Sequence, residues 1–187
     1  MTVDTSVTGN VNQKGTATDS FTAASVSGNV TQEEGNLATV TTASIGGNLE
    51  QNGGKVVAQG DTLSVSGTTT QNGGAICDAN DEMTLTGKLT QNGGTMAADT
   101  LAANDGAEIS GTVTAATSLT AAGKDVEVKS GGTLTAPTIT AANLKTAGAV
   151  TSTVEVKGNV AGTAGALGAQ DGAGAAFKKA GGGAVGA

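Results

Sequence analysis

The chain has no histidine, arginine, tryptophan or tyrosine among its 187 residues, and only two phenylalanines, one proline and one cysteine. Without histidine and with one cysteine, this chain alone cannot build a zinc site, a serine–histidine triad or a cysteine–histidine dyad. The lack of arginine and of stacking aromatic rings, at a net charge of −7, argues against nucleic-acid binding and sugar-stacking platforms. We therefore expect no enzyme, no metal ion, no cofactor and no nucleic-acid partner.

The sequence also argues against an internal disulfide, a membrane span and an N-terminal signal peptide. Cys77 cannot form an internal disulfide, and we interpret it as a small buried hydrophobe beside Ile76, with a disulfide between subunits as the alternative. No run approaches the roughly 18 apolar residues of a membrane span. The first five residues, M-T-V-D-T, lack the basic and apolar regions of a signal peptide. We expect a mature chain, a chain exported without such a signal, or an intracellular one.

Three small residue types fill half of the chain, as 31 glycines, 31 threonines and 32 alanines. The larger apolar side chains are 17 Val, 10 Leu, 4 Ile, 3 Met and 2 Phe. A conventional globular core for a chain of this length would contain more bulk and more aromatic area. A stable fold therefore requires a narrow core and extensive backbone hydrogen bonding.

A seven-residue motif recurs five times at nearly constant intervals. It reads V-T-G-N-V-N-Q from Val7, V-S-G-N-V-T-Q from Val26, I-G-G-N-L-E-Q from Ile45, V-S-G-T-T-T-Q from Val65 and L-T-G-K-L-T-Q from Leu85. Successive copies lie 19, 19, 20 and 20 residues apart, and a degenerate copy begins at Ile109 after 24 residues. A period near 20 is too short for pairs of helices and is typical of one coil of a β-solenoid.

The residue types also favour strands. Thr, Val, Gly, Asn and Ser dominate, and apolar residues alternate, as at Val126 and Val128. We predict an all-β fold, a single β-solenoid (parallel β-helix) of about seven or eight coils spaced about 4.8 Å apart. The solenoid spans residues 7–160, after an N-terminal strand in residues 1–6 and before a Gly/Ala-rich C-terminal arm in residues 161–187.

Two sets of positions should stack from coil to coil. The first apolar residues of the copies should form a core column: Val7, Val26, Ile45, Val65, Leu85 and Ile109. The Gln-Asn-Gly-Gly corners should form a structural turn ladder, since Asn and Gly tolerate positive φ and stacked amides hydrogen-bond their equivalents. Its members are Gln51, Asn52, Gly53, Gln71, Asn72, Gly73, Gln91, Asn92 and Gly93. A metal or ligand site there is disfavoured because the ladder lacks carboxylates.

The C-terminal arm differs from the repeats. Nine Gly and ten Ala fill most of residues 161–187, and Phe177 is the bulkiest residue there. Alone, such a segment should be disordered. We interpret it as an arm that docks on a neighbouring subunit with Phe177 as its anchor; a secretion signal or a plain linker are the alternatives.

The repeat resembles two families of bacterial filament proteins. The corners Gln51/Gly53, Gln71/Gly73 and Gln91/Gly93, with Ser25, Ser44 and Ser64, are similar to curlin-type functional amyloid subunits, although the chain has only two aromatic residues and an extra residue separates Ser from Gln. The V-x-G-x-V pattern at Val26, Gly28 and Val30, and near Ile109, resembles bactofilins, which are cytosolic β-helical filament proteins. Both resemblances imply a polymerising structural protein.

A solenoid has open strand edges at both ends, and no cap is evident before Val7. We expect subunits to stack head to tail into a homopolymer, an extracellular or cell-surface filament. A cytosolic bactofilin-like filament is the alternative.

Two other classes of solenoid are less favoured. An ice-binding solenoid needs aligned Thr-x-Thr triplets, but Thr68 is 3 residues after Val65 whereas Thr39 is 13 after Val26, which predicts triplets out of register. A polysaccharide-acting solenoid could use a carboxylate pair at about 5.5 Å. The acidic residues Asp61, Asp78, Asp81, Glu82, Asp99 and Asp105 are more simply explained as solvated loops.

Overall fold

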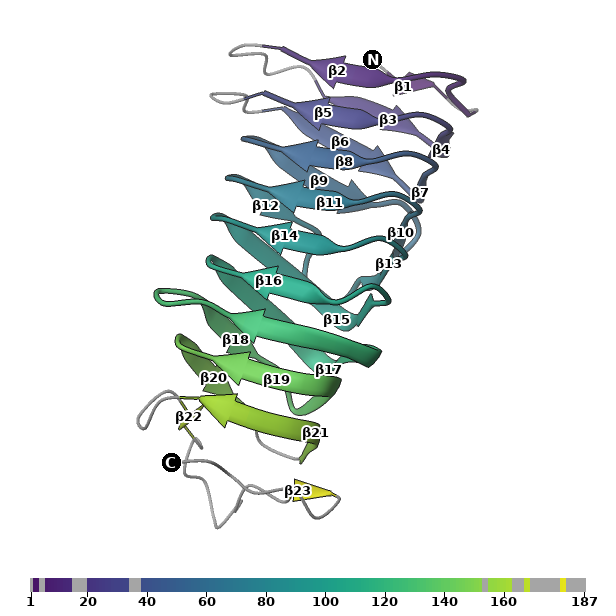
Figure 1. Cartoon of the computed structure of the whole chain (residues 1–187). Helices are drawn as coiled ribbons and strands as arrows, with labels where there is room; N and C mark the ends of the chain where they lie inside the picture. Colours follow the sequence, from purple (N-terminus) through teal and green to yellow (C-terminus); the bar gives the residue numbers. More distant parts are fainter. Residues whose placement is uncertain are drawn as a thin grey trace.

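The computed structural model describes residues 2–3, 6–14, 20–33, 38–152, 155–162, 167–168 and 179–180. Within these ranges the chain is all-β, and its named strands pair in parallel with the coil before and the coil after. The result is a β-solenoid of about seven turns, with β1 and β23 at opposite ends (Figure 1). The predicted fold class is confirmed.

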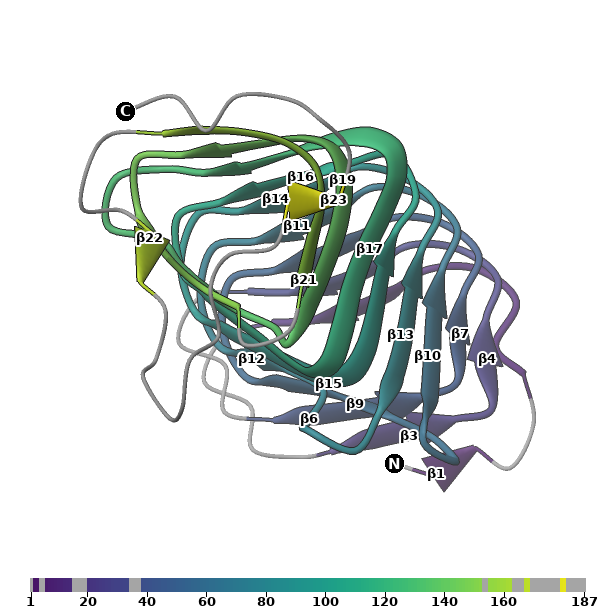
Figure 2. The same cartoon turned by 90° about the horizontal axis from the view of Figure 1, so that it is seen from below.

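Each coil has three sides, which are evident in the view along the axis (Figure 2). The glutamine face consists of β2 (Val11–Gln13), β5 (Val30–Gln32), β8 (Leu49–Gln51), β11 (Thr69–Gln71), β14 (Leu89–Gln91) and β16 (Ala107–Ile109). The hydroxyl face begins with β4 (Ser25–Val26), β7 (Ser44–Ile45), β10 (Thr62–Val65) and β13 (Glu82–Leu85). The third face consists of β1 (Thr2–Val3), β3 (Phe21–Ala23), β6 (Thr39–Thr42), β9 (Lys55–Ala58), β12 (Ala75–Ile76), β18 (Thr133–Thr135), β20 (Ala149–Thr151) and β22 (Leu167–Gly168).

Four longer strands turn the corners in the second half of the solenoid. They are β15 (Thr95–Ala103), β17 (Thr112–Val128), β19 (Thr138–Thr146) and β21 (Glu155–Gly162), and β23 (Lys179–Ala180) pairs with the last of them. Their pairings shift register between Ala98 and Thr100 and between Ala121 and Asp125, which are corners between faces. Such irregularities bend a strand and allow it to pass from one face to the next.

The core is a narrow column of side chains from the inward positions of all three faces. Its largest members, such as Ile45, Leu63, Ile76 and Leu119, are 0–1 % exposed. Alternation along each strand places one side chain inward and the next outward. Stacking of coils pairs the backbone groups of each strand with both neighbours, so few bulky residues suffice.

The predicted core column is buried in its central part. Val26, Ile45, Val65 and Leu85 are at most 1 % exposed and lie in adjacent register on the hydroxyl face. Val7 pairs with Val26 but is only half-buried, because it lies in the first coil.

The assignment of Ile109 to this column is wrong. Ile109 is buried, but it pairs with Gln91 on the glutamine face, whereas Leu85 pairs with Ala103. The coil after Leu85 is thus 18 residues long, and the motif-like sequence from Ile109 occupies a different part of the coil. Any apolar inward residue satisfies the local pattern, so the motif did not fix the register.

Candidate functional site

The glutamines of the repeat form a ladder along the inside of the glutamine face. Gln32 donates from Nε2 to Gln13 Oε1 at 2.8 Å, Gln51 to Gln32 at 3.3 Å, Gln71 to Gln51 at 3.0 Å and Gln91 to Gln71 at 3.0 Å. From Gln32 to Gln91 these side chains are 0 % exposed. The predicted side-chain ladder is therefore present, but its glutamines lie in the core.

Each buried glutamine amide also satisfies backbone carbonyls near the corner. Gln51 Nε2 donates to the carbonyl of Ala75 at 2.7 Å, and Gln71 donates to that of Thr95 at 2.9 Å. Buried polar groups need such partners, since an unpaired one costs free energy. The ladder ends at Gln91, whose Oε1 has no partner among the described residues because the apolar Ile109 occupies the next position.

The corner asparagines stack outside this ladder. Asn72 Nδ2 donates to Asn52 Oδ1 at 2.6 Å, and Asn92 Nδ2 donates to Asn72 Oδ1 at 2.7 Å. Positive φ belongs to the last glycine of each corner, with φ of 64°, 72° and 77° at Gly54, Gly74 and Gly94. Gly53, Gly73 and Gly93 and the three asparagines do not adopt it. The predicted corner is present, but the residue that requires glycine is the one after those predicted.

A second asparagine ladder joins the first coils and was not predicted. Asn10 Oδ1 accepts the backbone N–H of Asn29 at 2.8 Å, and Asn29 Oδ1 accepts that of Asn48 at 2.8 Å. Asn48 Oδ1 then accepts the N–H of Thr68 at 2.9 Å. The Gly-Asn pair in the first three copies of the motif was the available signal.

The serines and threonines form aligned columns on the hydroxyl face. One outward column contains Ser25, Ser44, Ser64, Thr84, Ala102, Thr120 and Thr140. A second, two residues earlier along the strands, contains Thr62, Glu82, Thr100, Ser118 and Thr138. At the N-terminal end, Ser25 Oγ donates to Ser6 Oγ at 2.6 Å.

The third face aligns two of the Thr-x-Thr triplets directly. Thr112 pairs with Thr133, and Thr114 pairs with Thr135. The expectation that the triplets lie out of register is therefore wrong for these two. Sequence offsets fail as a guide here because corner lengths vary from coil to coil.

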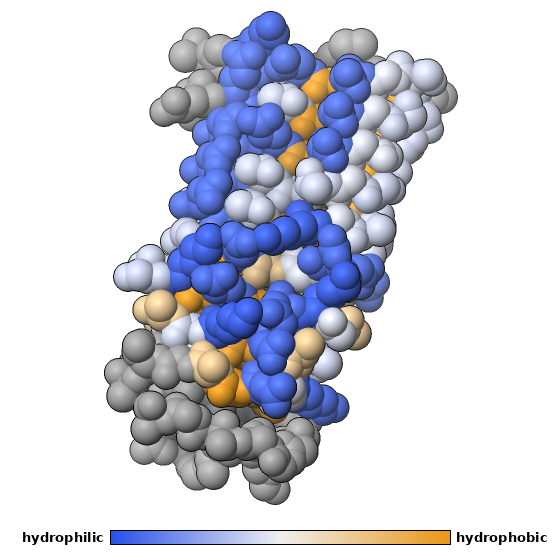
Figure 3. Space-filling view, in the orientation of Figure 1, coloured by the Kyte–Doolittle hydropathy of each residue, from blue (hydrophilic) through white to orange (hydrophobic). Residues whose placement is uncertain are grey.

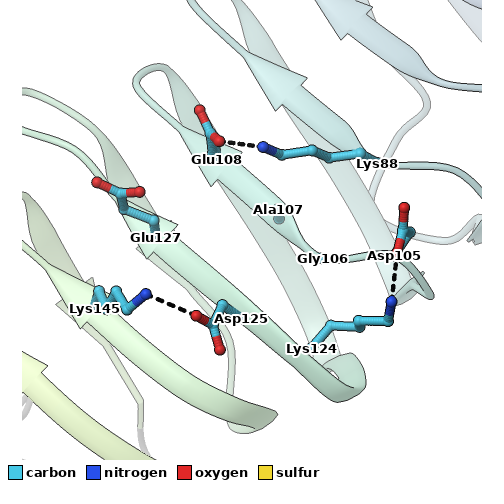
Figure 4. Close-up of a pocket in the computed structure, with 9 residues that line it drawn as sticks. All are labelled: Lys88, Asp105, Gly106, Ala107, Glu108, Lys124, Asp125, Glu127 and Lys145. Carbon is cyan, nitrogen blue, oxygen red and sulfur yellow. Dashed lines mark hydrogen bonds and ion pairs between the residues drawn. The ribbon is translucent and has the colours of Figure 1, made fainter.

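A charged groove of about 360 Å³ lies on the glutamine face, between β14 and β19. It forms where Gly106 interrupts a column of side chains between Lys88 and Asp125. Figure 4 shows lysines and carboxylates of successive coils pointing toward one another. Its lining residues are Lys88, Asp105, Gly106, Ala107, Glu108, Lys124, Asp125, Glu127 and Lys145.

Ion pairs connect neighbouring coils in this groove. Lys124 lies 2.6 Å from Asp105, Lys145 lies 2.7 Å from Asp125, and Glu108 pairs with Lys88 and, at 2.6 Å, with Lys129. Hydrogen bonds from Lys129 and Lys88 lower the pKa of Glu108 to about 2. The hydrogen bond from Lys124 likewise lowers the pKa of Asp105.

These contacts make the groove a connection between coils. Asp105, Glu108 and Asp125 each have a lysine partner, so the groove offers little unpaired charge of one sign to a ligand. Sequence reasoning missed it, although the opposite charges are spaced by about one coil along the chain, for example 20 residues between Lys88 and Glu108.

Of the acidic residues considered as a carboxylate pair, Asp61, Asp78 and Asp81 lie in loops between the third and hydroxyl faces, whereas Glu82 begins β13 and Asp99 lies in β15. Asp81 is buried, and its Oδ2 accepts the N–H of Asp78 at 3.0 Å. Asp61 adopts φ of 62°, and its carbonyl accepts the N–H of Glu82 at 2.9 Å. Asp105 belongs instead to the charged groove. The described residues contain no group of three or more His, Cys, Asp or Glu side chains that could hold a metal ion.

Cys77 is buried beside Ile76, as predicted. Burial, reinforced by the nearby charge of Asp81, raises the pKa of its thiol well above the usual range. A neutral thiol is a poor nucleophile. This position is therefore part of the core.

The two ends of the solenoid differ. At the first end, β2 pairs with β5, and no other described strand pairs with its outer edge. At the last end, β22 pairs with β20 and β23 pairs with β21. Within the described tail, residues 167–168 and 179–180 therefore extend the solenoid of their own chain, and docking of the tail on a neighbouring subunit stays a prediction. Phe177, the predicted anchor, lies outside the described residues.

Comparison with known proteins assigns the chain to no family. No protein-family model, curated protein or solved structure matches the chain significantly. Across the described ranges, no helix is long and apolar enough to cross a membrane.

Proposed function

We propose that this chain is a non-catalytic structural subunit that polymerises end to end into an extracellular or cell-surface filament. The observation that carries the proposal is the outer edge of β2, which continues the register of the solenoid. Val11 and Gln13 pair with Val30 and Gln32, and the same pairing recurs at Leu49 and Gln51. A coil of a second subunit can therefore pair with the outer edge of β2 in the same register in which β2 pairs with β5.

The backbone of β2 supports growth at this edge. Val11 donates its N–H to the carbonyl of Asn29 at 2.8 Å, toward the interior of the solenoid. Successive peptide groups of a strand point to opposite edges, so the N–H of Asn12 points outward. Exposed strand edges are templates for pairing with another chain.

The opposite end supplies a matching position. Val160 and Gly162 are the last described residues in the columns that begin at Val11 and Gln13. Contact between two different surfaces of one chain is head-to-tail, and it generates an open filament when the rotation does not close. The tail segments that pair with their own last coil extend the surface on which the next subunit stacks.

Two versions of this proposal differ in the cellular compartment in which the filament lies. A curlin-like role places the fibre outside the cell, and a bactofilin-like role places it in the cytosol. Detection of the chain in fibres sheared from cells supports the first, whereas retention in the cytosolic fraction supports the second.

The experiment that tests polymerisation is electron microscopy of the purified full chain beside Asn12→Pro. Proline removes the outward N–H and blocks edge pairing, and edge strands tolerate it. We expect filaments from the wild type and a folded, dispersed subunit from the variant. Glu50→Pro is the matched control, because Glu50 occupies the same column in β8, whose two edges are both paired.

The outcomes are distinct. Glu50→Pro should unfold the chain, since proline in a paired central strand removes a ladder hydrogen bond. Monodisperse wild-type chain at high concentration would contradict the proposal. A chain that ends at Val160 tests the tail, and we expect shorter filaments from it.

A further inference from the structure

The hydroxyl face is an ordered two-dimensional array. From β4 to β19, its two outward columns have serine or threonine at every position except Ala102 and Glu82, and on β21 the columns end with Glu155 and Lys157. Neither the filament proposal nor the ion pairs explain why these two columns are so rich in serine and threonine. Filament contacts involve the ends of the solenoid, and the charged groove lies on the glutamine face.

The backbone gives this array a regular lattice. Residues i and i+2 of a parallel strand are about 6.6 Å apart, and neighbouring strands are about 4.8 Å apart. Oxygen positions on the prism plane of hexagonal ice repeat at similar distances in two perpendicular directions. The array covers several coils, so many of its hydroxyl groups can contact an ice surface at the same time.

The core beneath the array holds it in place. The residues between the two columns, Leu63, Met83, Leu101, Leu119 and Ile139, are at most 1 % exposed. Close packing and parallel pairing on both sides restrict motion of the outward side chains. Preorganisation of this kind lowers the entropy lost on binding.

Charge distinguishes this face from the glutamine face. Figure 3 shows strongly hydrophilic residues over the glutamine face and a paler surface along the side where β4, β7, β10 and β13 lie in Figure 1. From β4 to β19, Glu82 is the one acidic or basic residue in the two columns, and Glu155 and Lys157 of β21 follow at their end. Threonine presents a methyl and a hydroxyl group together, whereas a charged side chain holds its own hydration shell.

We propose that the hydroxyl face adsorbs to ice. Threonine methyl groups lie against the ice surface while hydroxyl groups join its hydrogen-bonded lattice, and adsorbed chains restrain growth of the ice front between them. The proposal is independent of polymerisation, because each subunit has the complete array. In a filament the arrays of successive subunits would follow one another along the fibre.

The test is slow freezing of the wild-type chain, cleared of polymers by ultracentrifugation, with measurement of protein in the ice and the liquid. Ice recrystallisation is followed in parallel. The disrupting variant is Thr84→Lys with Thr120→Lys, which places two charges in the first column. The matched control is Thr70→Lys with Thr90→Lys, since these threonines are outward neighbours on the glutamine face.

We expect the wild type and the control to enter the ice and to inhibit recrystallisation, and the disrupting variant to lose both properties. Circular dichroism and melting temperature verify that both variants fold. If the lysine variant unfolds, Thr120→Val with Thr140→Val replaces it, and partial loss is expected because the methyl groups remain. Exclusion of the wild type from ice overturns the proposal. Retention of ice binding by the folded lysine variant, or equal loss in the control, overturns it as well.

Discussion

Glycines at the corners of this solenoid meet two separate constraints, and two substitutions distinguish them. Gly60 and Gly74 both have positive φ, 67° and 72°. A Cβ at Gly60 would meet nothing within 4 Å, whereas at Gly74 it would lie 2.5 Å from the Gly54 carbonyl oxygen and 2.8 Å from atoms of Gly53.

We expect Gly60→Ala to lower the free energy of unfolding by about 1–2 kcal/mol through backbone strain alone. Gly74→Ala should lower it further, because the close approach of two coils must also open. Urea unfolding followed by circular dichroism measures both. Equal losses would contradict the close approach as a separate constraint.

The lowered pKa of Glu108 makes the stability of the fold depend on pH in the acid range. Its pKa falls from the model-compound value of 4.5 to about 2, chiefly through the hydrogen bond from Lys129. A carboxylate whose pKa is lowered by folding stabilises the fold fully above its unfolded pKa, and this stabilisation is lost as the pH falls through the folded one. The window is therefore from about pH 4.5 down to about pH 2.

We expect Glu108→Gln to lower the melting temperature by a few degrees at pH 6 and to flatten its dependence on pH between 4.5 and 2. Glu50→Gln is the control, since Glu50 lies in the same outward column and no lysine among the described residues lies within ion-pair distance of it. Identical pH profiles for the two variants would exclude the ion pairs as the cause.

The buried glutamine ladder contributes to stability through hydrogen bonds between neighbouring coils. Gln71 both donates to Gln51 and accepts from Gln91, so Gln71→Leu removes contacts on two sides. We expect it to lower the free energy of unfolding by about 1–3 kcal/mol, because buried amide groups of its neighbours lose partners. Equilibrium unfolding in urea measures this loss.

Gln91→Leu is the matched comparison at the end of the ladder. It removes a buried Oε1 that has no partner among the described residues, and it places an apolar side chain next to Ile109. We expect a smaller loss than in Gln71→Leu, by about 1 kcal/mol. A larger loss in Gln91→Leu would mean that its bond to the Thr112 carbonyl dominates.

The strands themselves were predictable where the repeat is regular. From Val7 to Gln91 the motif fixes the stacking of Val26 on Ile45 and of Gln51 on Gln71. After Gln91 the corner lengths change and the glutamines end, so Ile109 was aligned with the wrong column. An apolar residue fits any inward position, and the long-range pairing with Gln91 alone identifies which one it occupies.

At the scale of the whole molecule, the solenoid separates its chemistry by face. Buried amides and ion pairs connect the coils on the glutamine face, while the hydroxyl face presents serine and threonine in columns. In the filament proposed above, subunits would join at the two ends. A filament in which subunits stack end to end keeps each face continuous, because the columns run parallel to the axis.

This arrangement predicts that length and stability are coupled. Each added coil pairs with the one before it, so stability of a solenoid is approximately a sum of nearest-neighbour terms. We expect full-chain filaments to melt at a higher temperature than the dispersed Asn12→Pro subunit, since the terminal coils gain neighbours. Equal melting temperatures for filaments and dispersed subunits, measured by calorimetry, would show that end contacts add no stability.

The sequence by itself determined the class of fold and the coil length of the regular repeats. Its period near 20 and its strand-forming residues are properties of the local sequence and of the composition, so they can be recognised without the tertiary structure. Only the tertiary structure decided which residues meet: the register of Ile109, the burial of the glutamines, the charged groove at Gly106 and the alignment of hydroxyl groups on one face. These depend on the exact length of every corner, because a change of one residue shifts all later side chains to another position on the coil.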